Sequence, residues 1–235
     1  MDPLLDIRGL NVFYGGFHAV LGIDITCDKG EILSIIGANG AGKSSTLKAI
    51  VGQVPRAEGT IRFEQRDITG LSTPERISSG IAIVPEGRKL FPKLSVEENL
   101  RIGGMAGRSG PVDLDTVYDL FPVLRERRLQ MAGQLSGGQQ QMVSIGRALM
   151  MNPSLILFDE ISLGLSPKIV TEIYAVLPTI RDRGISMLIV EQDITRSVAI
   201  ADRFVCMLEG RVALAGKRGD YTRDQIANSY FGAHA

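Results

Sequence analysis

Short apolar runs rich in Val, Ile and Leu recur along the 235-residue chain, and glycine, proline or polar residues bound each of them. Runs of this length predict β-strands, and continuously apolar ones predict strands covered on both faces. Segments with helical periodicity alternate with these runs, which predicts an α/β fold. The predicted strands lie within residues 4–14, 31–37, 81–86, 154–160, 186–192 and 203–216.

Two of these runs depart from the parallel pattern. Residues 4–14 and 203–216 have no helix between their halves, which favours antiparallel pairing. The expected sheet is therefore mixed, with a mainly parallel core and an antiparallel β portion. We expect one domain over residues 1–235, with a strand-rich core at about residues 1–87 and 152–235.

The strand pattern stops between about residues 88 and 151, where a helical subdomain is expected as an insertion in the core. Ser95 and Glu98 have the spacing of a capping box, which marks a helix start. Further helices are expected over 113–121 and 137–151.

Charge and cysteine content exclude several classes of protein. Lysine plus arginine equals aspartate plus glutamate at 26 each, so the net charge favours neither nucleic acid nor an anionic lipid surface as a partner. Cys27 and Cys206 have no C-x-x-C spacing, and we expect both to be core residues of a reduced, cytosolic protein. No apolar run approaches the roughly 18 residues that span a bilayer, and no signal peptide is expected. Any work at a membrane should therefore depend on a partner protein.

Residues 37–44 read G-x-x-x-x-G-K-S between a predicted strand and a predicted helix, the context that a phosphate-binding loop requires. We call these residues the phosphate loop. Its glycines allow a tight turn, and the helix start aims N–H groups at an anion. Lys43 is expected to reach the β and γ phosphates of ATP, and Ser44 to bind Mg²⁺. The candidate nucleotide-binding residues here are Gly37, Ala38, Asn39, Gly40, Ala41, Gly42, Lys43, Ser44 and Ser45.

A second candidate group follows the apolar run within 154–160, which ends in Asp159 and Glu160. Asp159 is expected to bind Mg²⁺, as the carboxylate of the second nucleotide motif does in this class of protein. Glu160 is the candidate general base that polarises a water for attack on the γ phosphate, a role that contributes about 10² to 10⁴ in rate. Alone, the pair is an ordinary polar exit from a strand; together with Lys43 it indicates nucleotide hydrolysis.

Residues 135–141 read LSGGQQQ at a predicted helix start, about twenty residues before Asp159. This stretch resembles the signature of ABC-type ATPases, and the resemblance covers nearly the whole chain. Tyr14 stands where that family stacks an aromatic ring on adenine, and Glu86 falls at its Q-loop. The signature residues are Leu135, Ser136, Gly137, Gly138 and Gln139, and the residues that resemble the D-loop are Ser162, Leu163, Gly164 and Leu165.

The resemblance implies a dimer. In the family two such chains face head to tail, and each ATP lies between the phosphate loop of one chain and the signature of the other. The physical chemistry agrees, because N–H groups and Ser136 at a helix start form a second anion clamp. One compact domain has no evident use for two such clamps, whereas a dimer that shares ATP uses both.

Polar residues also end the strand predicted over 186–192. Glu191, Gln192 and Asp193 follow its apolar run, and Thr195 is placed to begin a helix. Ligands of open parallel sheets gather at the carboxyl ends of strands, so these residues are candidates for a site. The resemblance identifies this strand as the family's switch, which faces the γ phosphate.

The family normally carries a histidine where this chain has Gln192. The only histidines are His18 and His234, and neither lies near this motif in the sequence. A glutamine amide can hydrogen-bond to phosphate or water but carries no proton at neutral pH. We therefore expect hydrolysis to depend on Glu160, with Gln192 as the second catalytic residue.

A second departure places Glu86 where most members of the family carry glutamine. A carboxylate there can still approach Mg²⁺, so Glu86 joins Ser44 and Asp159 as a candidate metal ligand. The combination of PEGR, SLGLSP and VEQ resembles one subfamily, the ATP-binding subunits of branched-chain amino acid importers of the LivF type. The resemblance implies that both departures are features of this subfamily.

The resemblance implies the partners as well. In that subfamily the subunit pairs with a homologous ATPase, two transmembrane permeases and a periplasmic solute-binding protein, which places it at the cytoplasmic face of the membrane. Residues 88–99 lie where the family contacts its permeases. The sequence leaves open import of urea, short amides or other amino acids, lipopolysaccharide-type export, a soluble non-transport ABC ATPase and a regulatory subunit with little hydrolysis.

Overall fold

The computed structural model describes residues 2–106 and 108–231, so His234 lies outside the described residues. The chain divides into two compact units. Met1–Arg76 and Ser186–Ala235 form the first unit, and Ile77–Ile185 form the second unit. The division predicted at residues 88 and 151 remains a proposal.

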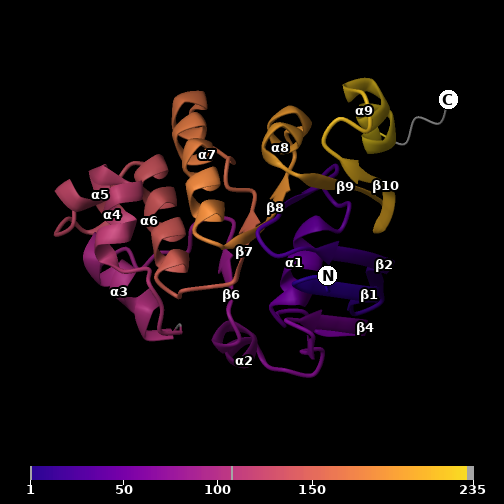
Figure 1. Ribbon diagram of the computed structural model, residues 1–235, viewed down its shortest axis with the longest axis horizontal. Coiled ribbons are helices and arrows are strands. Elements are labelled where there is room, and N and C mark those ends of the chain that lie inside the picture. The colour runs from indigo at the N-terminus through magenta and orange to yellow at the C-terminus, as the bar shows by residue number, and fades with distance from the viewer. Residues whose placement is uncertain (1, 107, 232–235) are drawn as a thin grey trace. The chain divides into compact units, whose positions relative to one another are not determined.

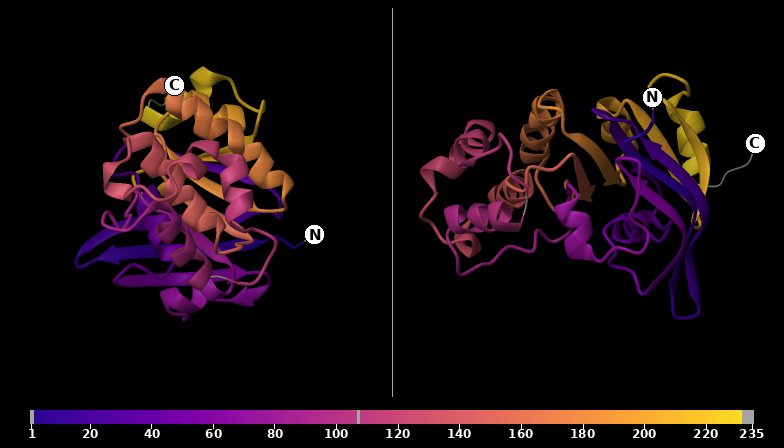
Figure 2. Two further views of the ribbon diagram at one scale, coloured as in Figure 1. Left: turned by 90° about the vertical axis from the view of Figure 1, so that its left-hand side faces the viewer. Right: turned by 60° about the horizontal axis from the view of Figure 1, so that its bottom comes forward.

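An antiparallel sheet in the first unit has the strand order β2-β1-β4-β5. Its strands are β1 (Leu5–Tyr14), β2 (Phe17–Cys27), β4 (Arg56–Phe63) and β5 (Arg66–Asp67). In Figure 1, β1, β2 and β4 lie side by side, and the right-hand view of Figure 2 shows the β1 and β2 hairpin as one long ribbon. The run within 4–14 is thus one strand with two antiparallel neighbours. The sequence did not predict β2, β4 and β5, and much of β4 and β5 is exposed and polar.

A mainly parallel set of strands completes the β structure of the first unit. Its strands are β3 (Ile32–Ile36), β8 (Ser186–Glu191), β9 (Arg203–Leu208) and β10 (Arg211–Lys217). β3 pairs in parallel with β8 and β9, and β10 pairs antiparallel with β9, as the sequence of the last run predicted. Every residue of β3 and β8 is buried, which explains their continuous apolar character.

Three helices flank these strands: α1 (Lys43–Ile50), α8 (Ile194–Ile200) and α9 (Arg223–Phe231). One core cluster contains Ile36, Phe204, Cys206 and Ile226, with partly buried residues of α8 and α9 packed against it. The helix α2 (Thr73–Ser78) runs across the boundary between the units. Its buried Arg76 donates to the carbonyl oxygens of Ala49 and Ile50, at 2.8 and 3.0 Å, and so caps the end of α1.

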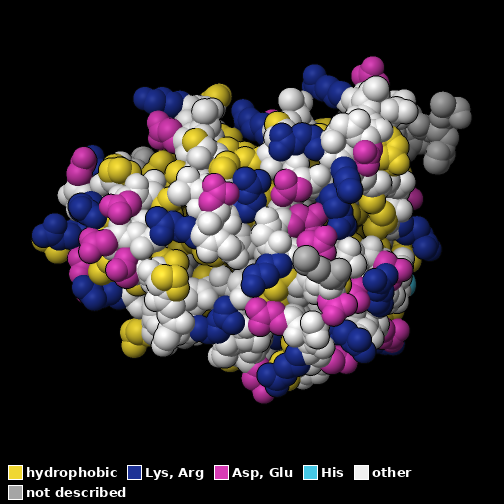
Figure 3. All heavy atoms as spheres, viewed as in Figure 1, with side chains coloured by type: hydrophobic (Ala, Val, Ile, Leu, Met, Phe, Trp, Pro, Cys, Tyr) yellow, Lys and Arg dark blue, Asp and Glu magenta, His cyan; other side chains and the backbone are white. Residues whose placement is uncertain are grey.

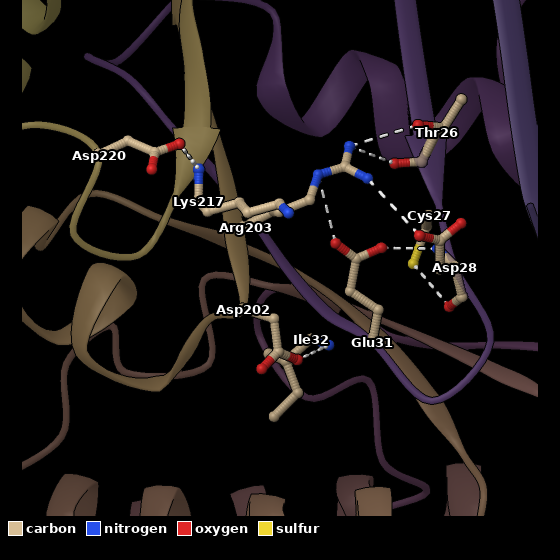
Figure 4. Close-up of polar contacts among 9 residues, drawn as sticks. All are labelled: Thr26, Cys27, Asp28, Glu31, Ile32, Asp202, Arg203, Lys217 and Asp220. Carbon is tan, nitrogen blue, oxygen red and sulfur yellow. Dashed lines mark hydrogen bonds and ion pairs between the residues drawn. The ribbon is translucent and has the colours of Figure 1, made fainter.

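A polar cluster lies at the amino-terminal end of β3 (Figure 4). Glu31, only 7% exposed, accepts the backbone N–H of Asp28 at 2.6 Å and lies 3.4 Å from the Nε atom of Arg203. Arg203 also donates to the backbone oxygen of Thr26 at 3.2 Å. Burial raises the pKa of the Glu31 carboxyl. Burial, followed by the charge of Glu31, raises the pKa of the Cys27 thiol well above its usual value.

Both cysteines are buried and reduced, as the sequence predicted. Burial raises the pKa of Cys206 to about 11, so this thiol, like that of Cys27, stays protonated at neutral pH. They act as small apolar residues of the core.

The second unit contains the parallel pair β6 (Ile81–Val84) and β7 (Leu155–Asp159). Its helices are α3 (Val96–Ala106), α4 (Leu114–Leu120), α5 (Pro122–Glu126), α6 (Gly137–Leu149) and α7 (Pro167–Asp182), with the 3₁₀ turn η1 (Ala132–Gln134) before α6. Figure 1 shows α3, α4, α5 and α6 side by side. The three helices predicted between 88 and 151 are present, and α5 adds a fourth because Pro122 begins a new helix where α4 ends.

The mixed α/β fold expected from the hydrophobic pattern is confirmed. Among residues 2–106 and 108–231, no helix has the length and apolar character needed to cross a bilayer.

Candidate functional site

The phosphate loop connects β3 to α1, as the sequence predicted, and its lysine folds back over it. The Nζ atom of Lys43 donates to the carbonyl oxygens of Gly37 at 2.8 Å and Ala38 at 3.0 Å. Lys43 is 4% exposed. An ammonium group buried within a loop of N–H donors is suited to a polyanion such as a triphosphate.

Two glycines of the phosphate loop are required by close backbone approach. A Cβ atom at Gly37 would lie 2.4 Å from the carbonyl oxygen of Met207, and one at Gly42 would lie 2.7 Å from that of Ala19. Gly42 also has φ 98°, a conformation that glycine adopts without penalty. The end of β9 and the start of β2 therefore set the path of the loop, and no larger residue fits at either position.

The switch residue shares an edge with the phosphate loop. In the parallel register of β3 and β8, Ile36 lies opposite Glu191, so Gly37 and Gln192 leave their strands at the same edge of the first unit. Glu191 is 2% exposed and Gln192 is half-buried. This is the arrangement expected of a phosphate loop and a switch residue that serve one ligand.

Asp193, next along this edge, caps a helix. Its side chain accepts the N–H of Arg196 at 3.1 Å, so α8 begins at Ile194. The helix thus starts one residue earlier than Thr195, the start that the sequence suggested. An aspartate at the N-cap position satisfies a helix donor that would otherwise lack a partner. Asp193 is therefore a structural residue.

In the second unit, β7 carries Asp159 at its last position, 4% exposed, and Glu160 directly after it. Glu160 is half-buried and has φ 51°, a left-handed conformation that is uncommon for a residue with a side chain. Strained backbone of this kind gathers at functional sites, which supports Glu160 as a catalytic candidate. The D-loop residues then form turns in which Leu163 and Leu165 donate to the carbonyl oxygens of Glu160 and Ser162.

Glu86 leaves the neighbouring strand at the same edge. In the parallel register of β6 and β7, Val84 lies opposite Phe158, so the segments that carry Glu86 and Asp159 both start at the carboxyl ends of this pair. Glu86 is exposed, whereas Asp159 is buried.

The signature begins α6 with a complete capping box. The Oγ atom of Ser136 accepts the N–H of Gln139 at 3.4 Å, and the Gln139 side chain accepts the N–H of Ser136 at 3.0 Å. Ser136 is exposed and Leu135 is buried. A Cβ atom at Gly138 would lie 2.5 Å from Cγ2 of Ile169, so this glycine allows α6 to approach α7.

Tyr14, the candidate adenine contact, is the last residue of β1. It is half-buried and lies opposite Phe17 across the tight turn of Gly15 and Gly16. Tyr14 therefore lies at the tip of a hairpin in the first unit.

The loop after Glu86 is held by a set of residues that the sequence pattern did not indicate. The carbonyl oxygen of Arg88 accepts from Ser144 Oγ at 3.0 Å and from the guanidinium of Arg147 at 3.2 Å. Farther along, the fully buried Asn99 bonds to both the N–H and the carbonyl oxygen of Phe91, at 2.9 and 3.0 Å. Polar side chains on an otherwise buried helix face are the sequence signal that could have found these residues.

The donor set suits Mg²⁺, which prefers oxygen ligands and keeps several waters and phosphate oxygens in its shell. Ser44 offers a hydroxyl, and Asp159 and Glu86 offer carboxylates. Among the described residues, no group of three or more histidine, cysteine, aspartate or glutamate side chains forms a preassembled metal cage. On the face shown in Figure 3, positive and negative side chains are interspersed.

Together these features define a P-loop ATPase. The family described as ABC transporter matches residues 20–162, and the chain belongs to this family. It is thus an ATP-binding and ATP-hydrolysing subunit of a transporter.

Individual relatives agree with this assignment. The chain is 39% identical to the high-affinity branched-chain amino acid transport ATP-binding protein BraG of Pseudomonas aeruginosa, over 97% of this chain and 100% of the relative. It is 34% identical to the probable branched-chain amino acid transport ATP-binding protein LivF of Archaeoglobus fulgidus, over 88% and 89%. A crystal structure of the ADP conformation of an ABC transporter ATP-binding cassette superposes with a TM-score of 0.81, at 29% identity over 99% of this chain and 96% of the other.

Proposed function

We propose that this chain powers the import of branched-chain amino acids through an ABC transporter. Its similarity to BraG, which spans nearly the whole length of both proteins, carries the proposal. The departures at Glu86 and Gln192 agree with it, because both match the subfamily that the sequence resembles. ATP closes two ATPase subunits, hydrolysis reopens them, and the permeases alternate their access.

Each ATP binds between the phosphate loop of one subunit and the signature of the other. The presence of two separate glycine-rich helix starts, at α1 and at α6, supports this arrangement. Phosphate oxygens accept from Lys43 and the loop N–H groups on one side and from Ser136 on the other. Adenine stacks on Tyr14.

Catalysis relies on residues at the carboxyl ends of the strands. Glu160 accepts a proton from the attacking water, and Gln192 donates its amide N–H to the γ phosphate. Ser44 and Asp159, with Glu86 as a further candidate, would hold Mg²⁺. When bound, it would supply positive charge against the charge that develops on the phosphates.

The permeases and the solute-binding protein complete the system, and the chain lies at the cytoplasmic face of the membrane through its permeases. Residues 88–99 form the permease contact, and Phe91, 47% exposed, is the apolar anchor. Beside it, the N–H of Ala132 donates to the carbonyl oxygen of Leu94, and Met131 is 50% exposed, which enlarges the apolar surface.

The test is solute-dependent turnover in the assembled complex. Proteins that co-purify with the chain from its native membrane identify the permeases, which are then reconstituted with it and their binding protein. Leucine, isoleucine and valine should stimulate ATP hydrolysis and accumulate inside the vesicles, and Glu160→Gln should abolish hydrolysis at this chain's own site and lower the accumulation. Stimulation by urea, a short amide or another amino acid instead would reassign the solute, and co-purification with repair or translation proteins would overturn the transport role.

A further inference from the structure

The turn that follows β6 is strained and is held in place from α6. Gly87, Arg88 and Lys89 all have positive φ, at 72°, 64° and 47°. Two of the three, Arg88 and Lys89, carry side chains, for which this conformation is strained. The two hydrogen bonds from Ser144 and Arg147 to the Arg88 carbonyl oxygen offset part of this strain.

The side chain of Arg88 extends from this turn to the start of α6. Its Nη1 atom donates to Oε1 of Gln140 at 3.4 Å. A Cβ atom built on Gly137 would lie 3.0 Å from Nη2 of Arg88, so the guanidinium lies against the signature backbone. The contact is within the second unit.

Gln140 in turn hydrogen-bonds to the segment that leads into the signature. Its Nε2 atom donates to the carbonyl oxygens of Ala132 and Leu135, both at 3.2 Å. Leu135 is the first signature residue, and Ala132 begins the 3₁₀ turn that leads into it. Arg88, Gln140 and these two carbonyls thus form a continuous series of hydrogen bonds, which we call the Arg88 relay.

The relay has a fixed direction. A guanidinium only donates and a backbone carbonyl only accepts, whereas a glutamine amide has one end of each kind. Reversing the amide of Gln140 would place its NH₂ group against the guanidinium and its oxygen against two carbonyl oxygens. Arg88 therefore sets the orientation of Gln140, and Gln140 in that orientation holds the loop before Ser136.

The spacing along α6 explains why one turn can control the helix start. Gly137, Gln140, Ser144 and Arg147 are three, four and three residues apart, so they lie on one face of the helix. Three of them hydrogen-bond to the guanidinium or the carbonyl oxygen of Arg88, and Gly137 leaves room for the guanidinium. A shift of the turn after β6 therefore acts on α6 along three of its turns.

We propose that Arg88 is a positioning residue that orients the signature through Gln140 and thereby controls hydrolysis of the ATP held in the partner subunit. The proposal rests on the proposed function, in which the signature serves the partner's ATP and residues 88–99 contact a permease. Movement of that segment reaches the signature through the relay. In this proposal Arg88 itself contacts neither the nucleotide nor the attacking water.

The test compares Arg88→Met, Gln140→Met and the double variant, which keep an unbranched side chain at each position but remove the hydrogen bonds of the relay. Arg101→Met is the matched control, because Arg101 pairs with Glu97 on the surface of α3 in the same unit. Backbone amide exchange in the isolated chain measures the order of residues 139 and 140, whose N–H groups bond to Ser136. Exchange there should rise about threefold to tenfold in each relay variant, the range expected for one net hydrogen bond, and stay unchanged in the control.

Turnover is then measured in the assembled complex with this chain's own site silenced by Glu160→Gln. The kcat of the partner's site should fall about threefold to tenfold in each relay variant. The affinity of this chain's phosphate loop for a fluorescent ATP analogue should stay unchanged, which a general structural defect would not allow. The double variant should be no worse than the more severe single variant, because both break one series.

Unchanged exchange at residues 139 and 140, or additive effects of the two substitutions, would overturn the relay. Faster exchange with unchanged kcat would overturn its control of hydrolysis. Ser136→Arg distinguishes failure of the proposed function: if that substitution leaves the partner's site at full activity, the signature does not serve it. The exchange result for Arg88→Met stands independently of that outcome.

Discussion

Two helices of this chain start at glycine-rich sequences proposed to bind phosphate, yet their first turns are built differently. At α1, the N-cap residue is Gly42 with a left-handed φ, and no side chain among the described residues caps it. At α6, Ser136 and Gln139 form a full capping box. We propose that a phosphate completes the first helix start, whereas the protein's own side chains complete the second.

The difference follows from what each helix start must do. In the proposed complex the phosphate loop wraps around the anion, so capping side chains would occupy the N–H groups that the phosphates need. The partner's signature approaches the same phosphates from one side only. Its Ser136 hydroxyl uses a lone pair for the capping bond and retains the O–H group as a donor toward an outside acceptor. The capping box thus orients the hydroxyl at no loss of donor capacity.

The largest effect should come from removing the cation of the uncapped helix start. Lys43→Ala is expected to weaken ATP binding to this chain about a hundredfold or more, because charged hydrogen bonds to phosphate contribute about 1.5–3 kcal/mol each. Glu160→Gln should keep the affinity and lose turnover, since that residue acts on the water. Calorimetric titration with ATP and Mg²⁺ measures the affinity of both variants, and phosphate release measures their turnover. The exposed Lys48→Ala on the same helix is the control. Equal loss of affinity in the two main variants would contradict the assignment.

Substitutions of Gln192 test whether the residue beside the phosphate loop acts on the ATP that the loop binds. Gln192→Ala should slow hydrolysis on the order of tenfold to a thousandfold, because a donor aimed at the transition state is lost. The wild-type rate should show no switch-residue titration between pH 5 and 8, whereas Gln192→His should acquire one. The measurement is a pH profile of single-site turnover with the partner's own site silenced. If Gln192→Ala hydrolyses ATP at the wild-type rate, Gln192 is a polar residue at the end of a strand and has no catalytic role.

The two signature glycines should differ in what they tolerate. Gly138→Ala places a Cβ atom 2.5 Å from Cγ2 of Ile169, and such overpacking should lower the free energy of unfolding by about 1–3 kcal/mol. Gly137→Ala meets only the flexible end of Arg88 at 3.0 Å, so its stability should change by less than about 1 kcal/mol. Urea unfolding of the two variants gives the comparison. If Gly137→Ala is the more destabilising change, the contact between Gly138 and Ile169 is not the tight packing of this helix start.

The smallest effect is expected at the opposite end of β3, where Glu31 has a protein partner in place of a ligand. Its pKa is raised in the folded chain, so the folded state binds the proton more tightly than the unfolded one. Stability from this group is therefore present at low pH and declines as the pH rises from about 4.5 through the raised pKa.

Glu31→Gln removes this titration and keeps an acceptor for the Asp28 N–H. Relative to wild type, the variant should gain stability as the pH rises from 4 to 7. Arg203, Asp28, Asp202 and Cys27 face the carboxylate and stay unchanged. Urea unfolding at each pH measures the difference, and a constant difference across the range would show that Glu31 does not titrate abnormally. ATP affinity should not change in this variant.

Local sequence determined a large part of this protein. The phosphate loop, the strands β3, β7 and β8 and the start of α6 were predictable because apolar runs and glycine spacing act within a few residues. The capping box at Ser95 and Glu98 is also present, with Ser95 accepting the Glu98 N–H at 3.2 Å. Strand β4 was missed because its pairing with β1, and not its own composition, makes it a strand.

Other features depend on the tertiary structure alone. Gly37 is needed because Met207, far along the chain, supplies a carbonyl oxygen 2.4 Å from where its Cβ would lie. Gly138 is needed because of Ile169, and Gln140 takes its orientation from Arg88. Close packing and hydrogen-bond direction depend on which distant segments meet, and a pattern read along one segment contains no information on its neighbours in space.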